Sequence, residues 1–302
     1  MEIKICILNY IIQTVGILIA VAFFTLYERK LLRYSQYRVG PNKVRIIGIL
    51  QPIRDAIKLF SKERIVPFKS IKVMYIISPI LTIFISLFIW LTCPYWFRGL
   101  EFRLSWLIIF CGMALNVMLV FMSGWSSNSK YSVLGSFRAI AQMISNEVVI
   151  SFIIISYILF INRYILNQLK YKSFTILIIP LGILWFIISL SESQRTPFDL
   201  AEGESELVSG FNTEYSAINF ALLFLGEYAS ILFIRLIRTI LIFGLKLNRI
   251  TLLVIFYIIF RLFIWCRSTF PRIRYDCLMM YIWKHLLTAL LIVLCSLLFI
   301  KY

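Results

Sequence analysis

The chain has 302 residues, of which 61% are hydrophobic, and its mean hydropathy is +0.90. Runs of roughly 20 mostly apolar residues recur along it, so the composition indicates a polytopic membrane protein. The run length favours helices over a membrane barrel, whose strands are about ten residues long with alternating hydrophobicity. We therefore expect an all-α polytopic membrane protein, with residues 1–302 forming a single integral membrane domain. The formal net charge of +17 does not indicate nucleic-acid binding, because the basic residues follow the loops of such a fold.

The apolar runs predict about eight transmembrane helices. They cover about 5–27, 73–93, 104–124, 145–162, 174–191, 216–236, 249–266 and 282–300. The fourth and the seventh are at the lower limit of length for a bilayer-spanning helix. The first resembles a secretory signal, but it is too long and lacks a basic leader and a small-residue cleavage site, so we expect it to stay in the mature chain.

The basic residues are unevenly divided between the two sides of these spans. One side carries 19 Lys and Arg residues, the other side 11, and Arg261 lies within a span. The positive-inside rule then predicts that the richer side faces the cytoplasm or the mitochondrial matrix, with the N-terminus on the opposite side.

The long loop at 28–72 contains a turn signal, Gly40-Pro41-Asn42, followed by apolar residues at helical spacing. Pro52 suits the first turn of such a helix. The pattern predicts a surface amphipathic helix over about 49–63. It would lie on the membrane, pack against a soluble partner, or do both.

A polar segment at 192–215 holds six of the fourteen acidic residues of the chain and one basic residue, Arg195. Its acids are Glu192, Asp199, Glu202, Glu204, Glu206 and Glu214. Acidic groups beside apolar helices are costly to desolvate, which favours chemistry with protons or cations over packing. The alternative is a solvated acidic loop between two spans.

Within this segment Thr196-Pro197-x-Asp199 has the pattern of a helix start, with a capping Thr and a Pro at the first position. A helix beginning there would place Asp199, Glu202 and Glu206 on one face and direct Glu204 elsewhere. Carboxylates so close together cannot all ionise if they are partly buried, so some pKa values would rise. Such a set would suit proton handling.

Three ionisable residues in the predicted spans bear on function. Glu147 opens the fourth span and Glu227 lies near the middle of the sixth, where a carboxylate is costly. For Glu227 we favour a functional role over a structural hydrogen bond, whereas for Glu147 both remain open. For Arg261 in the seventh span we favour a side chain that extends to the basic side.

The chain shows no pattern for a cofactor or a metal. Its six cysteines are scattered singly without CxxC spacing, and His285 is the sole histidine. A Gly-rich dinucleotide fingerprint and a P-loop are also absent from the sequence. We expect this chain to bind no redox cofactor and no metal itself, so that any redox group belongs to a partner.

Several runs resemble one known family. They are Glu28-Arg29-Lys30, residues 36–42 (QYRVGPN), 55–60 (DAIKLF), 123–128 (SGWSSN), 138–142 (RAIAQ), 195–212 and 267–276 (RSTFPRIRYD). They occur in the order typical of subunit 1 of proton-pumping NADH:quinone oxidoreductase, respiratory complex I, and they cover about residues 15–290. The chain is similar to that family over nearly its whole length.

The resemblance implies a heel subunit that forms the narrow tunnel by which ubiquinone reaches a neighbouring iron–sulfur subunit. The acidic loop would begin the charged path to the antiporter-like pumping subunits. FMN and iron–sulfur clusters would belong to partner subunits, and ubiquinone would be the substrate. Expected partners are the quinone-site and iron–sulfur subunits of the peripheral arm, small membrane subunits and membrane lipid. The location would be the mitochondrial inner membrane, or a bacterial plasma membrane, with the acidic loop on the matrix or cytoplasmic side.

The resemblance also suggests roles for particular residues. Tunnel or entrance positions would be Arg29, Arg38, Asp55, Arg195, Asp199, Glu202, Glu204 and Glu206. Carboxylates of the proton path would be Glu147, Glu192, Glu214 and Glu227. Positions that dock the peripheral arm would be Arg267, Arg272, Arg274 and Asp276. The sequence departs from the family pattern at Arg54, Asn146 and Arg261.

The expected mechanism involves no electron transfer by this chain. Quinone reduction by the neighbour would change the charge in the cavity, shift the coupled pKa values of the acidic segment and rearrange the 192–215 loop. One alternative is the homologous membrane subunit of an ion-translocating hydrogenase. Another is a proton-coupled secondary transporter, although such proteins usually contain repeated halves and this chain shows no internal repeat.

Overall fold

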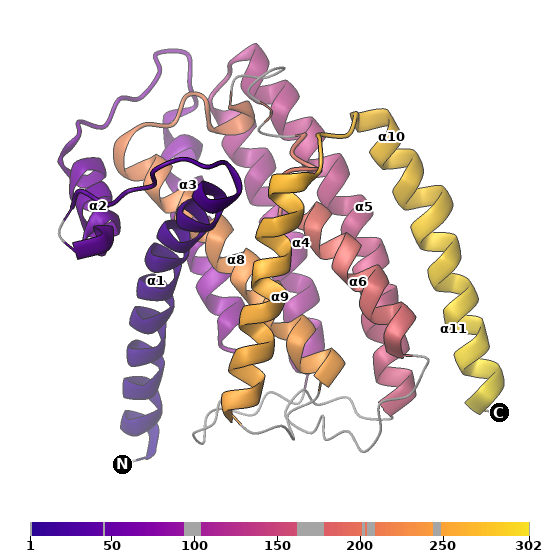
Figure 1. The fold of residues 1–302 in the computed structure, drawn as a ribbon. Helices are drawn as coiled ribbons and strands as arrows, with labels where there is room; N and C mark the ends of the chain where they lie inside the picture. The colour runs from indigo at the N-terminus through magenta and orange to yellow at the C-terminus, as the bar shows by residue number, and fades with distance from the viewer. Residues whose placement is uncertain are drawn as a thin grey trace.

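A computed structural model describes residues 2–44, 46–93, 104–161, 178–200, 203, 209–243 and 249–301. These residues form a bundle of long helices without any strand (Figure 1). In a bilayer a helix satisfies all of its backbone hydrogen bonds internally, which is why the apolar runs take this form. The all-α polytopic fold expected from the sequence is confirmed.

The described residues form thirteen helical elements. In chain order they are α1 (Glu2–Ser35), η1 (Ile46–Gly48), α2 (Gln51–Ser61), α3 (Lys72–Trp90), α4 (Ser105–Ser126), α5 (Lys130–Ile161), α6 (Ile178–Glu192), η3 (Gly210–Asn212), α8 (Ala217–Phe243), α9 (Arg249–Thr269), α10 (Tyr275–Met280), η4 (Tyr281–Leu286) and α11 (Leu287–Lys301). Elements α10, η4 and α11 form one continuous helix, in which η4 is a turn of π-helix.

Seven helices of the described residues are long and apolar enough to cross a membrane. They correspond to seven of the eight predicted spans. The remaining one, α6, has a shorter apolar part at Pro180–Glu192 in the described residues.

Several helices extend beyond the spans expected from hydropathy, among them α1, α5 and α8. Helix α1 continues past residue 27 to Ser35, α5 begins at Lys130 rather than near 145, and α8 continues past 236 to Phe243. In each case the hydropathy pattern ends the span at charged or polar residues. The structure keeps these residues helical, and the buried ones among them, such as Glu28, Gln142 and Arg238, contact neighbouring helices.

The amphipathic helix expected at about 49–63 is present as α2, beside the upper part of α1 in Figure 1. Its first turn contains Pro52, which is buried. Ile53, Ile57 and Phe60, at the spacing of one helix face, are exposed. The helix therefore offers an apolar surface that no described part of the chain covers.

Helices α3 and α8 pack closely in the middle of the bundle. Gly226 of α8 lies against the backbone of α3, where an added Cβ would be 3.2 Å from the carbonyl carbon of Thr82. Lipid gives helices no hydrophobic drive to associate, so small residues that allow close contact favour their packing. Gly226 and Thr82 thus bring α8 to the centre of the bundle, with Glu227 and Tyr228 next in its sequence.

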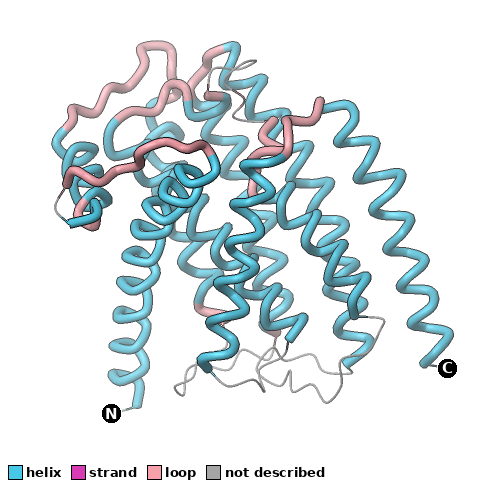
Figure 2. The backbone as a smooth tube through the Cα atoms, viewed as in Figure 1, coloured by secondary structure: helices cyan, strands magenta, loops and turns pink. Residues whose placement is uncertain are grey.

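Most of the described connections gather at one end of the bundle (Figure 2). The segments after α1, after α2, after α6 and after α9 all lie there, whereas both ends of the chain lie at the opposite end. The segment after α6, which begins the acidic region, is therefore close to the loop at 270–274 and to the end of α1.

Candidate functional site

A pocket of about 380 Å³ lies between α1, α2 and α8. Small or apolar side chains, among them Ala22, Ala56 and Phe224, form much of its wall. At its polar side Arg29 of α1 pairs with Asp55 of α2 at 3.1 Å, and Asp55 also accepts a hydrogen bond from the Gln51 amide at 2.8 Å. The structure thus brings the predicted entrance residues Arg29 and Asp55 together at one pocket.

Aromatic and cationic groups continue from this pocket into the bundle. The Phe224 ring, which lines the pocket, lies 4.6 Å from the Tyr228 ring one turn further along α8. The Arg195 guanidinium lies over both rings, at 5.7 Å and 4.9 Å from their centroids. Contacts of this kind hold a cation against an apolar wall. Arg195 therefore connects the pocket to the acidic segment.

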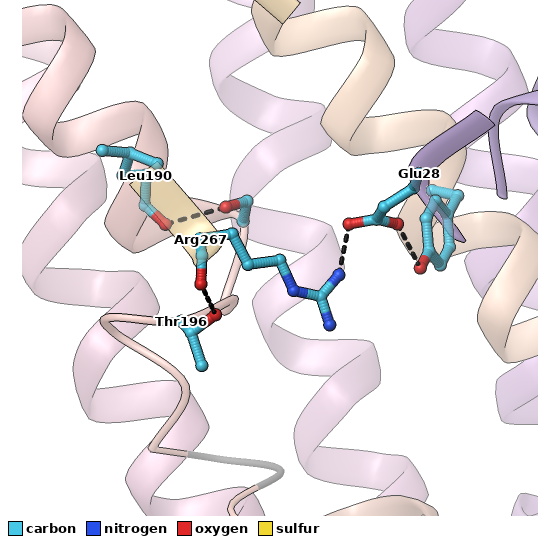
Figure 3. Close-up of polar contacts among 6 residues, drawn as sticks. Glu28, Leu190, Thr196 and Arg267 are labelled. Atoms are coloured by element: carbon cyan, nitrogen blue, oxygen red, sulfur yellow. Dashed lines mark hydrogen bonds and ion pairs between the residues drawn. The ribbon is translucent and has the colours of Figure 1, made fainter. Parts of the chain in front are cut away.

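Tyr228 belongs to a buried ion-pair cluster that joins α1, α8 and the end of α9. Its hydroxyl donates a hydrogen bond to Glu28 Oε2 at 3.0 Å, and the Arg267 guanidinium pairs with Glu28 Oε1. Figure 3 shows the Arg267 side chain reaching from its helix to Glu28, while its carbonyl accepts a hydrogen bond from Thr196. A buried carboxylate needs such a partner if it is to stay ionised.

The prediction of a helix starting at Thr196 is wrong for the described residues. Residues 195–200 form turns, in which the Phe198 amide donates to the Arg195 carbonyl. The Thr196 hydroxyl does not cap a helix, because it donates to the Arg267 carbonyl at 3.2 Å. The Ile273 amide likewise donates to the Pro197 carbonyl at 3.0 Å. Tertiary hydrogen bonds thus replace the expected helical ones.

Two further contacts hold this turn. Arg272 pairs with Asp199 at 3.1 Å. The buried Gln142 amide of α5 donates to the carbonyls of Ser191 and Phe198, at 2.8 and 3.0 Å. The segment that begins the acidic region is therefore fixed from both α5 and the loop after α9.

A small internal cavity of about 50 Å³ lies beyond Arg195. Glu192 at the end of α6 and Glu227 of α8 both line it, together with Arg195 and Ser230. A space of this size can hold a few water molecules when polar groups surround it. Two carboxylates for which the family resemblance implies a place on a proton path thus line the same cavity.

Glu147 of α5 extends this set. It interacts electrostatically with Glu192, and Asn146 beside it accepts a hydrogen bond from the Ser191 hydroxyl at 2.8 Å. Oε1 of Glu147 and Oε2 of Glu192 are buried and have no hydrogen-bond partner among the described residues. Buried oxygens of this kind are places where water or a proton is bound.

Glu214 lies in a different cluster, between η3 and α8. Its carbonyl accepts a hydrogen bond from the Tyr75 hydroxyl at 2.6 Å, and the Tyr75 ring stacks on that of Tyr215 at 4.3 Å. Burial raises the pKa of Tyr215 above its ordinary value, against the lowering effect of hydrogen bonds with Ser126 and Ser78. Tyr215 therefore stays protonated and fixes this connection.

The other predicted residues are spread around the site. Glu202, Glu204 and Glu206 lie outside the described residues. Arg38 is exposed after α1 and does not line the pocket. Arg274 and Asp276 form an exposed pair at 3.3 Å.

Of the departures, Arg54 and Arg261 are exposed, and the Arg261 guanidinium lies 5.6 Å from the Tyr257 ring.

Four ionisable residues that the sequence did not single out are buried here: Glu28, Tyr228, Arg235 and Arg238. Glu28 was expected in the first loop, and the two arginines were counted among the 11 basic residues of the less basic side. The Arg235 guanidinium instead lies 4.3 Å from the centroid of the Phe263 ring, inside the bundle. These residues could have been recognised from the sequence if the helices had been expected to continue beyond the apolar runs.

Within the described residues there is no group of three or more His, Cys, Asp and Glu side chains that could hold a metal ion.

A family model described as NADH dehydrogenase matches residues 8–298. Three similar proteins are each named NADH-ubiquinone oxidoreductase chain 1. The one from Artemia franciscana is 46% identical over 289 residues, covering 94% of this chain and 95% of its own. The one from Aedes aegypti is 46% identical over 291 residues, 93% of each chain. The one from Sarcophilus harrisii is 43% identical over 291 residues, 93% of this chain and 92% of its own.

Proposed function

The chain belongs to the NADH dehydrogenase family, and on that premise we propose that this membrane-arm subunit of NADH:ubiquinone oxidoreductase forms the ubiquinone passage and couples quinone reduction to proton translocation. The similar proteins named above favour this function over a hydrogenase subunit or a secondary transporter.

One observation carries the proposal. The pocket between α1, α2 and α8 meets Phe224, Phe224 contacts Arg195, and Arg195 lines the cavity of Glu192 and Glu227. A route from an apolar surface to buried carboxylates is what a quinone passage coupled to protons requires. The volume of the pocket is within the range of about 300–1,000 Å³ that small-ligand sites occupy.

The exposed apolar side of α2 supports a membrane location for the pocket. Ile53, Ile57 and Phe60 would lie among lipid, as in other interfacial helices. An isoprenoid chain could then pass from the bilayer between α1 and α2, while Arg29 and Asp55 face the quinone head group.

Proton coupling would use Glu147, Glu192 and Glu227. A negative charge formed on the quinone beside Arg195 would change the electrostatic free energy of these carboxylates. Two unit charges about 4 Å apart interact with about 4 kcal/mol at an effective dielectric constant near 20. That is enough to change their protonation. The acids Glu202, Glu204, Glu206 and Glu214 would extend the path along the acidic segment.

The redox groups would belong to other subunits. FMN and iron–sulfur clusters would lie in the peripheral arm, whose quinone-site and iron–sulfur subunits would contact Arg272, Arg274 and Asp276. Arg267 was also expected to dock that arm, but its guanidinium pairs with Glu28 inside the chain. The complex would lie in the mitochondrial inner membrane, with the acidic segment on the matrix side.

A blocking substitution tests the passage. Ala56→Trp would fill the pocket between α1 and α2, so we expect the assembled complex to lose most of its ubiquinone reductase rate. Its rate with a soluble acceptor that takes electrons from the peripheral arm should not change. Ile57→Trp is the matched control, because residue 57 is exposed on the same helix and does not line the pocket. Equal quinone rates in both variants would exclude the pocket as the passage.

A charge-neutral substitution tests the coupling. Glu227→Gln should lower the number of protons moved per electron in sealed vesicles, because the carboxylate in the cavity can no longer accept a proton. Glu63→Gln, which alters an exposed carboxylate after α2, should leave that ratio unchanged. An unchanged ratio for Glu227→Gln would remove this residue from the proton path.

A further inference from the structure

A second groove lies where α6, α8 and α9 meet, away from the pocket between α1 and α2. Its volume is about 550 Å³. Its walls are mainly apolar and include Phe186 of α6, Ile242 of α8 and Ile259, Leu262 and Trp265 of α9. The size is again within the range of small-ligand sites, about 300–1,000 Å³. None of the roles given to the predicted residues uses this groove.

One charged side chain, Arg238 of α8, lines the groove. The residue is 7% exposed, and its guanidinium lies 4.5 Å from the Phe186 ring and 5.5 Å from the Phe263 ring. Its Nε and Nη1 atoms are buried without a hydrogen-bond partner among the described residues. Arg238 is thus a nearly buried cation that lines the groove.

The described residues supply no anion for this cation. The groups that act on Arg238 electrostatically are the Tyr157 hydroxyl and Arg235, which has the same sign of charge. Aromatic contacts of a cation contribute only about 0.5–2 kcal/mol each. A guanidinium in apolar surroundings is far more costly than that unless it is paired. Within the part of the chain that the structure describes, the groove thus combines a cation that has no anionic partner with an apolar wall.

We infer that this groove binds a single-chain amphiphilic carboxylate of the fatty-acid class. The carboxylate would pair with Arg238, and the hydrocarbon chain would lie along α6 and α9. Guanidinium and carboxylate form charge-assisted hydrogen bonds with well-defined geometry. The site is separate from the proposed quinone passage, so either could fail without the other.

The depth of Arg238 favours a fatty acid over a phospholipid. Its Cα lies five residues, or about 7.5 Å, before the end of α8 at Phe243. Side chains of a helix point toward the helix N-terminus, so the guanidinium lies deeper still. A fatty-acid carboxylate is small enough to reach the guanidinium at this depth. A phospholipid head group could reach it only by moving all of its polar groups away from the membrane interface.

Photolabelling of the assembled complex tests the inference. The probe is hexadecanoic acid bearing a diazirine on its chain, and labelled peptides are identified by mass spectrometry. We expect labels on α6 and α9 residues of the groove, and excess hexadecanoate should abolish them. Arg238→Gln should lower the labelling about tenfold, which corresponds to about 1.4 kcal/mol. Arg261→Gln, at an exposed arginine of α9 outside the groove, should leave it unchanged.

A second variant keeps the test valid if Arg238→Gln does not assemble. Ile183 lines the groove and is exposed, so Ile183→Trp should narrow the groove without a change at Arg238 and should also reduce labelling. Absence of groove labels in the unaltered complex would overturn the inference. So would labelling that Arg238→Gln leaves unchanged. A diacyl phospholipid probe that labels the groove where the fatty acid does not would also overturn it.

Discussion

Glu28 and Arg29 are consecutive residues of α1, yet their side chains join ion pairs in different surroundings. In the outer pair the side chains of Arg29 and Asp55 are 50% and 34% exposed. In the inner pair those of Arg267 and Glu28 are 26% and 9% exposed. Consecutive residues of a helix are about 100° apart around its axis. Arg29 of α1 can therefore line the pocket while Glu28, the residue before it, belongs to the buried cluster.

This difference in exposure suggests different roles for the two ion pairs. The outer pair, Arg29 with Asp55, can respond to a ligand, whereas the inner pair, Arg267 with Glu28, holds helices together. Exposed pairs contribute about 0–1 kcal/mol because water competes for both charges. Breaking a buried pair costs about 3–5 kcal/mol because one charge stays behind without a partner. We therefore expect the outer pair to affect quinone binding and the inner pair to affect stability.

The largest effect should come from Glu28→Gln. This change removes the charge that pairs with Arg267, so we expect a loss of up to about 3–5 kcal/mol in the stability of the bundle. The measurement is the heat inactivation temperature of the assembled complex. In the combined variant Glu28→Leu with Arg267→Leu neither charge remains, and most of the loss should be recovered. If both forms are inactivated like the unaltered complex, the inner pair does not hold these helices.

Gln142→Leu should loosen the inner region without a change of charge. It removes the side-chain donor of the Ser191 and Phe198 carbonyls, which keep the backbone amides of Gln194 and Leu200 as donors, so each lost hydrogen bond should cost about 0.5–1.5 kcal/mol. Hydrogen exchange of the segment at 193–200 should become faster, while exchange in α2 should stay the same. Exchange that is unchanged in the segment would mean that Gln142 does not fix it.

For Tyr228→Phe we expect an intermediate loss of stability. The hydroxyl donates to a charged acceptor, so its loss should cost about 1.5–3 kcal/mol while the aromatic contacts with Arg195 and Phe224 remain. The heat inactivation temperature of the assembled complex measures this loss. A loss as large as that of Glu28→Gln would show that the ring, rather than the hydrogen bond, was disturbed.

Asp55→Asn should have the smallest effect on stability, within about 1 kcal/mol. Since Asp55 lines the pocket, the KM for ubiquinone should rise while the heat inactivation temperature hardly changes. A clear fall in stability with an unchanged KM would reverse the distinction between the two pairs.

Hydropathy predicted much of the fold, because a bilayer allows few structures for runs of apolar residues. Helix α2 followed from helical spacing, and Glu147, Glu192 and Glu227 were recognised as carboxylates beside or within apolar helices. The cluster of Glu28 with Arg267 was not predicted. These residues are 239 positions apart, and the hydropathy pattern ended the first span just before Glu28. A local sequence pattern cannot show that a charged residue is paired with a residue of a distant helix.

Local patterns also failed at Thr196, for a related reason. The residues have the features of a helix start, but their hydrogen-bonding groups contact Arg267 and Ile273 instead. Arg235 and Arg238, at the end of the sixth predicted span, were counted among the 11 basic residues of the less basic side. The structure places them against aromatic rings inside the bundle. Tertiary contacts decide each of these cases, and they are absent from a single segment of sequence.

The position of a long-chain ubiquinone bound to the assembled complex tests the central claim most directly. The account predicts that its isoprenoid chain lies between α1, α2 and α8, in contact with Ala56 and Phe224, and that its head group points past Arg29 toward Arg195. A quinone chain that enters between other helices, with the pocket filled by lipid, would contradict it.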